Sequence, residues 1–170
     1  MEMKPSRLLD NAALKYTFIN QLNTVYRVKS HLSNQLSELK SLATFSNLKF
    51  ALEEEIHDVK NQLTRLEQIF NLLDTAPSGT NCLGIDAIIR EAFDNIKPNA
   101  ITDFQSDLAL TFYMSIIEHI EVGGFRMLNL TSKCLQSVQI EQLLLESFDE
   151  AKDSARLFTM IAKEYIAVGD

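Results

Sequence analysis

The sequence predicts an all-α protein, an antiparallel bundle of four long helices with a short satellite helix in one connection. Apolar residues recur at alternating steps of three and four along four long stretches, which is the spacing of amphipathic helices. Glycine and proline are scarce, with 5 and 3 among 170 residues, so the turns that a β-sandwich or barrel needs are missing. This length suits one domain, and we expect a single domain over residues 1–170 with its core at about 15–167.

The first predicted helix covers residues 15–42, and its inward stripe is apolar except at one position, Lys29. The second covers residues 47–73, with Ser46 as the predicted N-cap, because its hydroxyl can accept a bond from a free amide of the first turn. The inward stripe of the second helix carries two polar residues, Glu55 and Gln62.

The connection after the second helix is long. Residues 74–80 contain both proline and glycine and predict a loop. A short helix at 83–96 follows, which we expect to cover the bundle and to end before Pro98.

Two more long helices are predicted over residues 103–133 and 138–167. Thr102 and Gln105 form a capping box at the start of the third long helix, and Ser137 is a predicted cap of the fourth. The glycine pair 123–124 inside the third helix indicates either close packing against another helix or a kink. The inward line predicted for this helix is Leu108, Thr111, Ser115, Glu118, Val122, Phe125 and Asn129.

Loop lengths predict the topology. Short connections make the first two and the last two long helices antiparallel hairpins, and the long connection joins them as a crossover. That is the ferritin-like arrangement.

Composition excludes several function classes. The formal net charge of −7 disfavours nucleic-acid binding, and no apolar run is long enough to span a membrane. Residues 1–6 lack the apolar segment of a signal peptide, and Cys82 and Cys134 show no CxxC spacing, so we expect a cytoplasmic protein with reduced thiols. Nucleotide-binding glycine motifs and a nucleophile elbow are also missing.

Carboxylates on the second and third long helices are candidate metal ligands, because ferritin-like bundles hold metals with inward Glu and Glu-x-x-His residues. The literal motif occurs at Glu54–His57, but the stripe turns Glu54 outward. Glu55 with Asp58 is the better inward pair at the same spacing. Glu118 lies on the inward line of the third helix, and Glu121 follows one turn later.

The chain resembles the YciE/YciF-like ferritin-like proteins over about residues 15–165. The segments that carry the resemblance are Gln62–Phe70 (QLTRLEQIF), Cys82 with Ile85–Ile89 (IDAII), Glu118–Glu121 (EHIE) and Asp149–Lys152 (DEAK). The resemblance implies a ferritin-like fold, a homodimer, an association with bacterial stress responses, no established activity, and a dimetal site bridged by carboxylates.

Residue by residue, the implied metal site is incomplete. Lys29 stands where the family has a glutamate on the first helix, and Ala151 and Ala155 stand where it has two carboxylates on the fourth. Glu118 and Glu121 match family carboxylates. Independently, the periodicity places positions 29, 151 and 155 on inward stripes.

Three interpretations follow from this pattern. In the first, Lys29 forms a buried ion pair with Glu55 and Glu118 and takes the electrostatic role of a lost metal, so that no cofactor is bound. In the second, Glu55, Asp58, Glu118 and Glu121 form a remnant site for one iron or manganese ion. In the third, Lys29 reaches solvent along its alkyl stem.

The first interpretation favours a non-catalytic structural or stress-associated protein, acting through a homodimer. The second favours a metal-dependent oxidase or a peroxide-consuming protein. A helical adaptor with an exposed apolar face is a further reading. We expect the contact surface at the segment before Lys15 or on the satellite helix, and the sequence names no protein partner.

Overall fold

The computed structural model describes residues 10–79, 83–99 and 102–166. It contains five α-helices and, in those ranges, no strand, which confirms the all-α prediction. The helices are α1 (Asn11–Leu42), α2 (Ser46–Leu72), α3 (Leu83–Asn99), α4 (Asp103–Thr131) and α5 (Val138–Ile166), with a 3₁₀ turn at Ser132–Leu135 between the last two.

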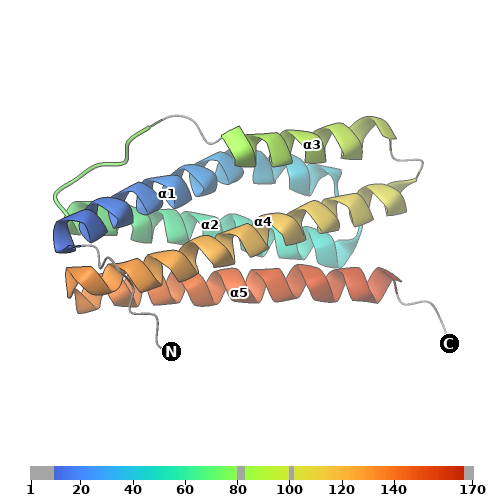
Figure 1. The fold of residues 1–170 in the computed structure, drawn as a ribbon. Coiled ribbons are helices and arrows are strands. Elements are labelled where there is room, and N and C mark those ends of the chain that lie inside the picture. The colour runs from blue at the N-terminus through green and yellow to red at the C-terminus, as the bar shows by residue number, and fades with distance from the viewer. Residues whose placement is uncertain (1–9, 80–82, 100–101, 167–170) are drawn as a thin grey trace, which may run out of the picture.

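The four long helices form an antiparallel bundle (Figure 1). Helices α1 and α5 run in one direction, and α2 and α4 run in the other. Each of α1 and α5 packs against both α2 and α4, so every neighbouring pair is antiparallel. Helix α3 lies in the crossover between α2 and α4 and covers α4 and α1 from outside, as predicted for the satellite helix.

Side-chain caps begin several helices. Asp10 accepts a hydrogen bond from the amide of Ala13 at 2.7 Å at the start of α1. Thr102 accepts one from the amide of Gln105 at 3.2 Å, which confirms the helix start that the capping-box pattern predicts.

The predicted N-cap of α2 is wrong. Ser46 is the first residue of the helix, the N-cap is Phe45, and no side-chain cap bond is made there. Instead the buried carboxylate of Asp107, on α4, accepts hydrogen bonds from the amides of Thr44 and Phe45 and from the Thr44 hydroxyl. Asp107 therefore satisfies the amides that precede the helix, and not those of its first turn.

Two helix ends also differ from the prediction. Helix α3 continues through Pro98 to Asn99, three residues beyond the predicted end. Helix α4 ends at Thr131 and tightens into the 3₁₀ turn, where Gln136 follows with a positive φ of 51°.

The core consists of two apolar clusters, one toward each end of the bundle. The first surrounds Leu36, Leu52 and Phe158 and includes residues from α3. The second surrounds Phe18, Phe70 and Phe125. Along α2 the first cluster ends at Val59 and the second begins at Leu66, and along α4 the change comes between Ile117 and Phe125. Several buried polar residues, among them Lys29, Glu55, Gln62, Glu118 and Glu121, lie near the boundary between the two clusters.

The glycine pair in α4 serves close packing at one position. A Cβ atom at Gly124 would lie 3.0 Å from Cγ2 of Val25, so α4 and α1 approach closely there. A Cβ atom at Gly123 would meet nothing within 4 Å. The helix continues through both residues without local unwinding.

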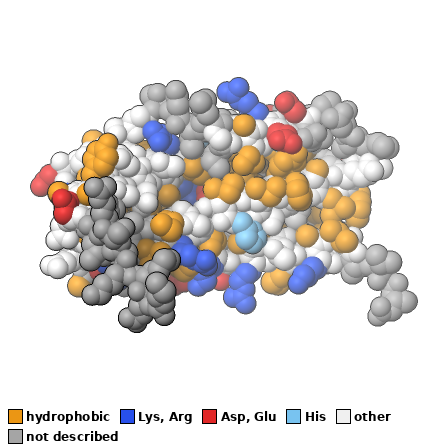
Figure 2. Space-filling view, in the orientation of Figure 1, with side chains coloured by type: hydrophobic (Ala, Val, Ile, Leu, Met, Phe, Trp, Pro, Cys, Tyr) orange, Lys and Arg blue, Asp and Glu red, His pale blue; other side chains and the backbone are white. Residues whose placement is uncertain are grey.

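Hydrophobic side chains also reach the surface where α3 and α4 lie side by side (Figure 2). No helix among the described residues is both long enough and apolar enough to cross a membrane.

Candidate functional site

Four ionisable side chains meet in the middle of the bundle, near the boundary between the two apolar clusters. Lys29 comes from α1, Glu55 from α2, and Glu118 and Glu121 from α4. Their exposed fractions are 0%, 1%, 0% and 3%, so all four are removed from water. The amphipathic stripes of three helices carry these residues inward at the same level, and this explains why the charges meet.

Lys29 is the only cation of this charged centre. Its Nζ lies 3.7 Å from Oε1 of Glu55 and donates a hydrogen bond to Oε2 of Glu121. The sequence analysis named Glu55 and Glu118 as its partners. In the structure Glu121 makes the direct contact, and neither oxygen of Glu118 accepts a hydrogen bond from a described residue. Residues 118 and 121 are one helical turn apart, and the later of the two lies nearer to Lys29.

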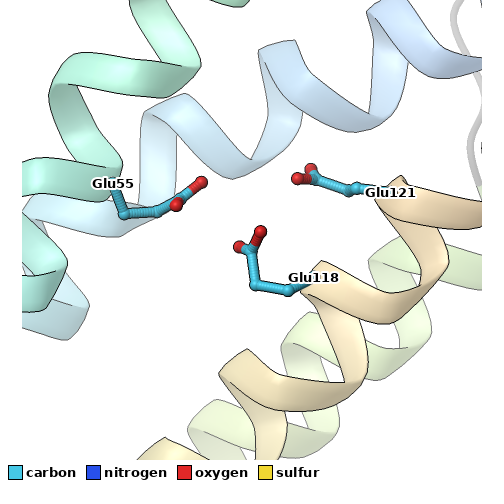
Figure 3. A group of neighbouring side chains, drawn as sticks. All are labelled: Glu55, Glu118 and Glu121. Carbon is cyan, nitrogen blue, oxygen red and sulfur yellow. The ribbon is translucent and has the colours of Figure 1, made fainter. Parts of the chain in front are cut away.

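The three carboxylates converge on one another (Figure 3). One oxygen from each of Glu55, Glu118 and Glu121 lies within 4.8 Å of the others. Five of their six oxygens accept no hydrogen bond from any part of the chain that the structure describes. Buried carboxylate oxygens without donors are costly, so something must offset their charge.

Bound protons can offset part of the negative charge of the three carboxylates. Burial raises the pKa of Glu118 well above its ordinary value, and the negative charges of Glu55 and Glu121 raise it further. Burial raises the pKa of Glu121 to about 7, although Lys29 acts in the opposite direction. Glu118 is therefore the acid of this group that holds a proton at neutral pH.

Lys29 itself stays charged. Burial alone lowers the pKa of a lysine, but the fields of Glu121, Glu55 and Glu118 more than offset that effect and raise it above the ordinary value. One ammonium and three ionised carboxylates would leave two negative charges in the core. Protonation of Glu118 removes one of them, and protonation of Glu121 would remove the other.

A pair of divalent ions does not fit this set of donors. Two such ions need several carboxylates and usually a histidine from each of two helices. Here three carboxylates converge, and the ammonium of Lys29 lies against two of them. The positions that the family resemblance assigns to carboxylates on α5 hold the buried side chains of Ala151 and Ala155.

The remaining candidate residues lie outside the converging group. Glu54 and His57 are exposed on α2, as the stripe predicts for Glu54. Asp58 is half-buried, and burial followed by repulsion from Glu150 and Glu55 raises its pKa. Asp58 faces the side where α2 packs on α5. On that side the two terminal guanidinium nitrogens of Arg65 (α2) each donate a hydrogen bond of 2.6 Å to the carboxylate of Glu150 (α5).

Sequence reasoning missed one buried carboxylate altogether. Asp107 is 0% exposed and accepts bonds from the turn between α1 and α2, more than 60 residues away in sequence. Nothing in the local pattern around it signals this role, because its partners, two backbone amides and the Thr44 hydroxyl, lie more than 60 residues away in sequence. Cys82, by contrast, lies outside the described residues, and Cys134 is a free thiol.

The fold and its charged centre define a helical bundle of the ferritin-like arrangement. The family model that matches residues 13–168 is described as a domain of unknown function, DUF892. The chain belongs to this family, as its resemblance to YciF-like proteins predicted.

Solved structures agree with the fold. The stress protein YciF of E. coli is 20% identical with a TM-score of 0.85, and the match covers 92% of this chain and 98% of that one. YcfI of Rhodopseudomonas palustris, described as a candidate structural protein, is 22% identical with a TM-score of 0.81 and the same coverage. No curated protein sequence matches the chain.

Proposed function

We propose that this chain is a non-catalytic structural bundle of the YciF-like type, in which the ammonium of Lys29 replaces a metal centre. The observation that carries the proposal is the position of Lys29, fully buried and in contact with carboxylates from two other helices. A cation at this place connects α1 to α2 and α4. It also offsets the negative charge of carboxylates that would otherwise be available to bind a metal ion.

Two features support a structural role over a catalytic one. The charged centre is closed to solvent, with at most 3% of any of its four residues exposed, so a substrate has no direct access to it. Its remaining charge is balanced by protons on glutamates whose pKa values are raised. The E. coli relative is named a stress protein, and we extend an association with stress to this chain as part of the proposal.

The test is the metal content of the full chain, purified without chelator and measured by elemental mass spectrometry. The proposal expects much less than one iron or manganese ion per chain, and no gain after incubation with either ion followed by desalting. A stoichiometric ion that survives desalting would overturn it.

One observation favours a second candidate, a single-metal protein with oxidase or peroxide-consuming activity. Oxygens of Glu55, Glu118 and Glu121 lie within 4.8 Å of one another and could hold one iron or manganese ion if Lys29 moved aside. Glu118→Gln separates the two proposals, because a neutral amide replaces a protonated acid with little cost but is a much weaker metal ligand. Loss of bound metal in this variant would support the second candidate.

A further inference from the structure

An acidic groove lies where α2 packs on α5. It consists of two hollows, one of about 580 Å³ lined by residues of α2 and one of about 350 Å³ lined by residues of both helices. The two hollows share Glu54 and Asp58, so they adjoin each other. Among the described residues, the carboxylates that line the groove are Glu53, Glu54, Asp58 and Asp153. Both volumes fall in the range of small-molecule sites.

Three of these carboxylates have no cation beside them. Glu53 pairs with Lys40 of α1 at 3.1 Å. Glu54, Asp58 and Asp153 form no ion pair within the part of the chain that the structure describes. Asp58 is half-buried, and burial is the first cause that raises its pKa. The groove therefore presents negative charge that the folded chain balances only in part.

A buried hydroxyl also lines the groove without a hydrogen-bond partner. Ser154 of α5 is 8% exposed and belongs to the second hollow. The buried hydroxyls of Thr111 and Ser147 each donate to a carbonyl oxygen four residues earlier, but Ser154 makes no side-chain hydrogen bond to a described residue. Buried polar groups normally have a partner. The oxygen of Ser154 can accept a hydrogen bond from a donor that enters the groove.

The arrangement of the carboxylates favours an elongated cation over a metal ion. In the described ranges, three carboxylates that could hold one ion converge at Glu55, Glu118 and Glu121, and no such group is found in the groove. Glu54 and Asp58 are one turn apart on α2, where Cβ atoms are about 5–6 Å from each other. Ammonium groups that are joined by a short methylene chain have a similar separation. A linear polyamine carries its charges in this way.

Apolar side chains lie among the charges of the groove. Leu157 is half-buried, and Phe50 and Met160 are 69% and 63% exposed. The methylene groups of a polyamine can cover these side chains and remove apolar surface from water. A hydrated metal ion gains nothing from such contacts. One guanidinium, that of Arg156, also lines the second hollow and opposes the binding of a cation.

We propose that the acidic groove is a binding site for a linear polyamine. One ammonium group binds between Asp58 and Asp153 and donates a hydrogen bond to Ser154. The next binds at Glu54, and the methylene groups pack on Leu157 and Met160. This inference goes beyond the proposed function and does not depend on the charged centre.

Equilibrium dialysis of the full chain against radiolabelled spermidine at low ionic strength tests the proposal. Binding should saturate at one molecule per chain, and an equal concentration of Mg²⁺ should not displace it. Asp153→Asn should weaken binding at least about fivefold, because a charge-assisted hydrogen bond is lost. Asp149→Asn is the matched control. It removes the same charge from the same helix, but Asp149 pairs with Lys152 and does not line the groove, so the affinity should not change.

A second pair of variants changes the affinity in the opposite direction. Arg156→Gln should strengthen spermidine binding, because it removes the positive charge from the second hollow. Lys163→Gln makes the same change of charge on α5 outside the hollow and should have little effect. Circular dichroism confirms that each variant is folded.

Competition experiments identify the kind of cation. Butylamine, which has a single ammonium group, should displace spermidine only at much higher concentration. Several results would each overturn the proposal. They are the absence of saturable spermidine binding, equal affinities of Asp153→Asn and Asp149→Asn, no gain in Arg156→Gln, and displacement by butylamine or Mg²⁺ at equal concentration. Binding of tetralysine without binding of spermidine would also overturn it and would indicate a basic protein segment as the partner.

Discussion

The ammonium nitrogen of Lys29 lies 3.7 Å from Oε1 of Glu55, and both side chains are buried. A buried ion pair of this kind is not by itself a large source of stability, because both ions lose their hydration. It does make each partner indispensable to the other, since removal of one leaves an uncompensated charge in the core. The charged centre is therefore the place where single substitutions should have the clearest effects.

Lys29→Met should lower the free energy of unfolding by about 3–5 kcal/mol, because the buried carboxylates lose their only cation. Chemical denaturation at pH 7 measures this change. Lys40→Met is the matched control on the same helix, since Lys40 pairs with Glu53 at the surface, where an ion pair contributes at most about 1 kcal/mol. Equal stability of the two variants would mean that Lys29 does not neutralise the carboxylates.

Lys29→Glu should turn the charged centre into a metal site. Four buried carboxylates would then come from α1, α2 and α4, and the metal-free variant should be strongly destabilised by their repulsion. Added Mn²⁺ should raise its melting temperature progressively, because an ion that binds only the folded state stabilises it by mass action. The melting temperature of the wild type should not change with added Mn²⁺. If the melting temperature of the variant does not change either, position 29 does not control metal binding.

The stability of the wild type should fall as the pH rises from about 4.5 through 7 and beyond in the presence of a chelator. The folded-state pKa values of Glu118 and Glu121 are raised above the ordinary 4.5, so the stability that their protonation supplies is complete below about 4.5. It is lost as the pH passes through the folded-state values, about 7 for Glu121. Thermal melts at several pH values would show the decline.

Glu118→Gln is the control for this pH dependence. Its amide has the shape of the protonated acid and cannot ionise, so the variant should keep its stability at pH 7 and lose less of it than the wild type as the pH rises further. If wild type and variant show the same slope, the carboxyl of Glu118 does not hold a proton in the folded state.

Asp107→Asn should destabilise the protein by about 2–4 kcal/mol, because charge-assisted hydrogen bonds to buried amides are lost. An amide NH₂ group would also face the donors of Thr44 and Phe45, which lie within hydrogen-bond distance of Asp107. Asp103→Asn, an exposed change in the first turn of the same helix, should have a small effect. Urea denaturation measures the free energy of unfolding of both variants. A small effect at both positions would contradict the role of Asp107 as the acceptor for Thr44 and Phe45.

Much of the bundle could be predicted because α1 and α2 each bury a single stripe. Phe18, Leu32 and Leu52 lie on these two stripes and are fully buried. Lys29 and Glu55 were found the same way, as polar exceptions on apolar stripes. Periodicity identifies the inward face reliably when the outward face is polar.

Helix α4 was harder to predict, because it is apolar on more than one side. Leu108, Ser115 and Asn129 were expected on the inward line and are only half-buried, whereas Leu110 and Met114 are buried. Neighbours on three sides (α1, α3 and α5) bury part of this helix, and its exposed residues Phe112, Met127 and Leu130 add further apolar surface. Hydrophobic spacing alone cannot distinguish these faces from one another.

Asp107 could not be predicted for a different reason. Its role depends on which distant backbone amides lie unpaired beside it, and this is set by the packing of two hairpins and not by local sequence. The bonds from the amides of Thr44 and Phe45 to Asp107 of α4 were missed for the same reason.

The contact of Asp107 with the turn after α1 also bears on how the molecule folds. The amides at the tip of the first hairpin have an acceptor only once the second hairpin has arrived, because that acceptor is contributed from 62 residues further along the chain. Until then the amides of this turn must be solvated by water. Docking of the two halves and completion of the first turn become a single cooperative event, and a fragment that contains α1 and α2 alone would have a frayed tip.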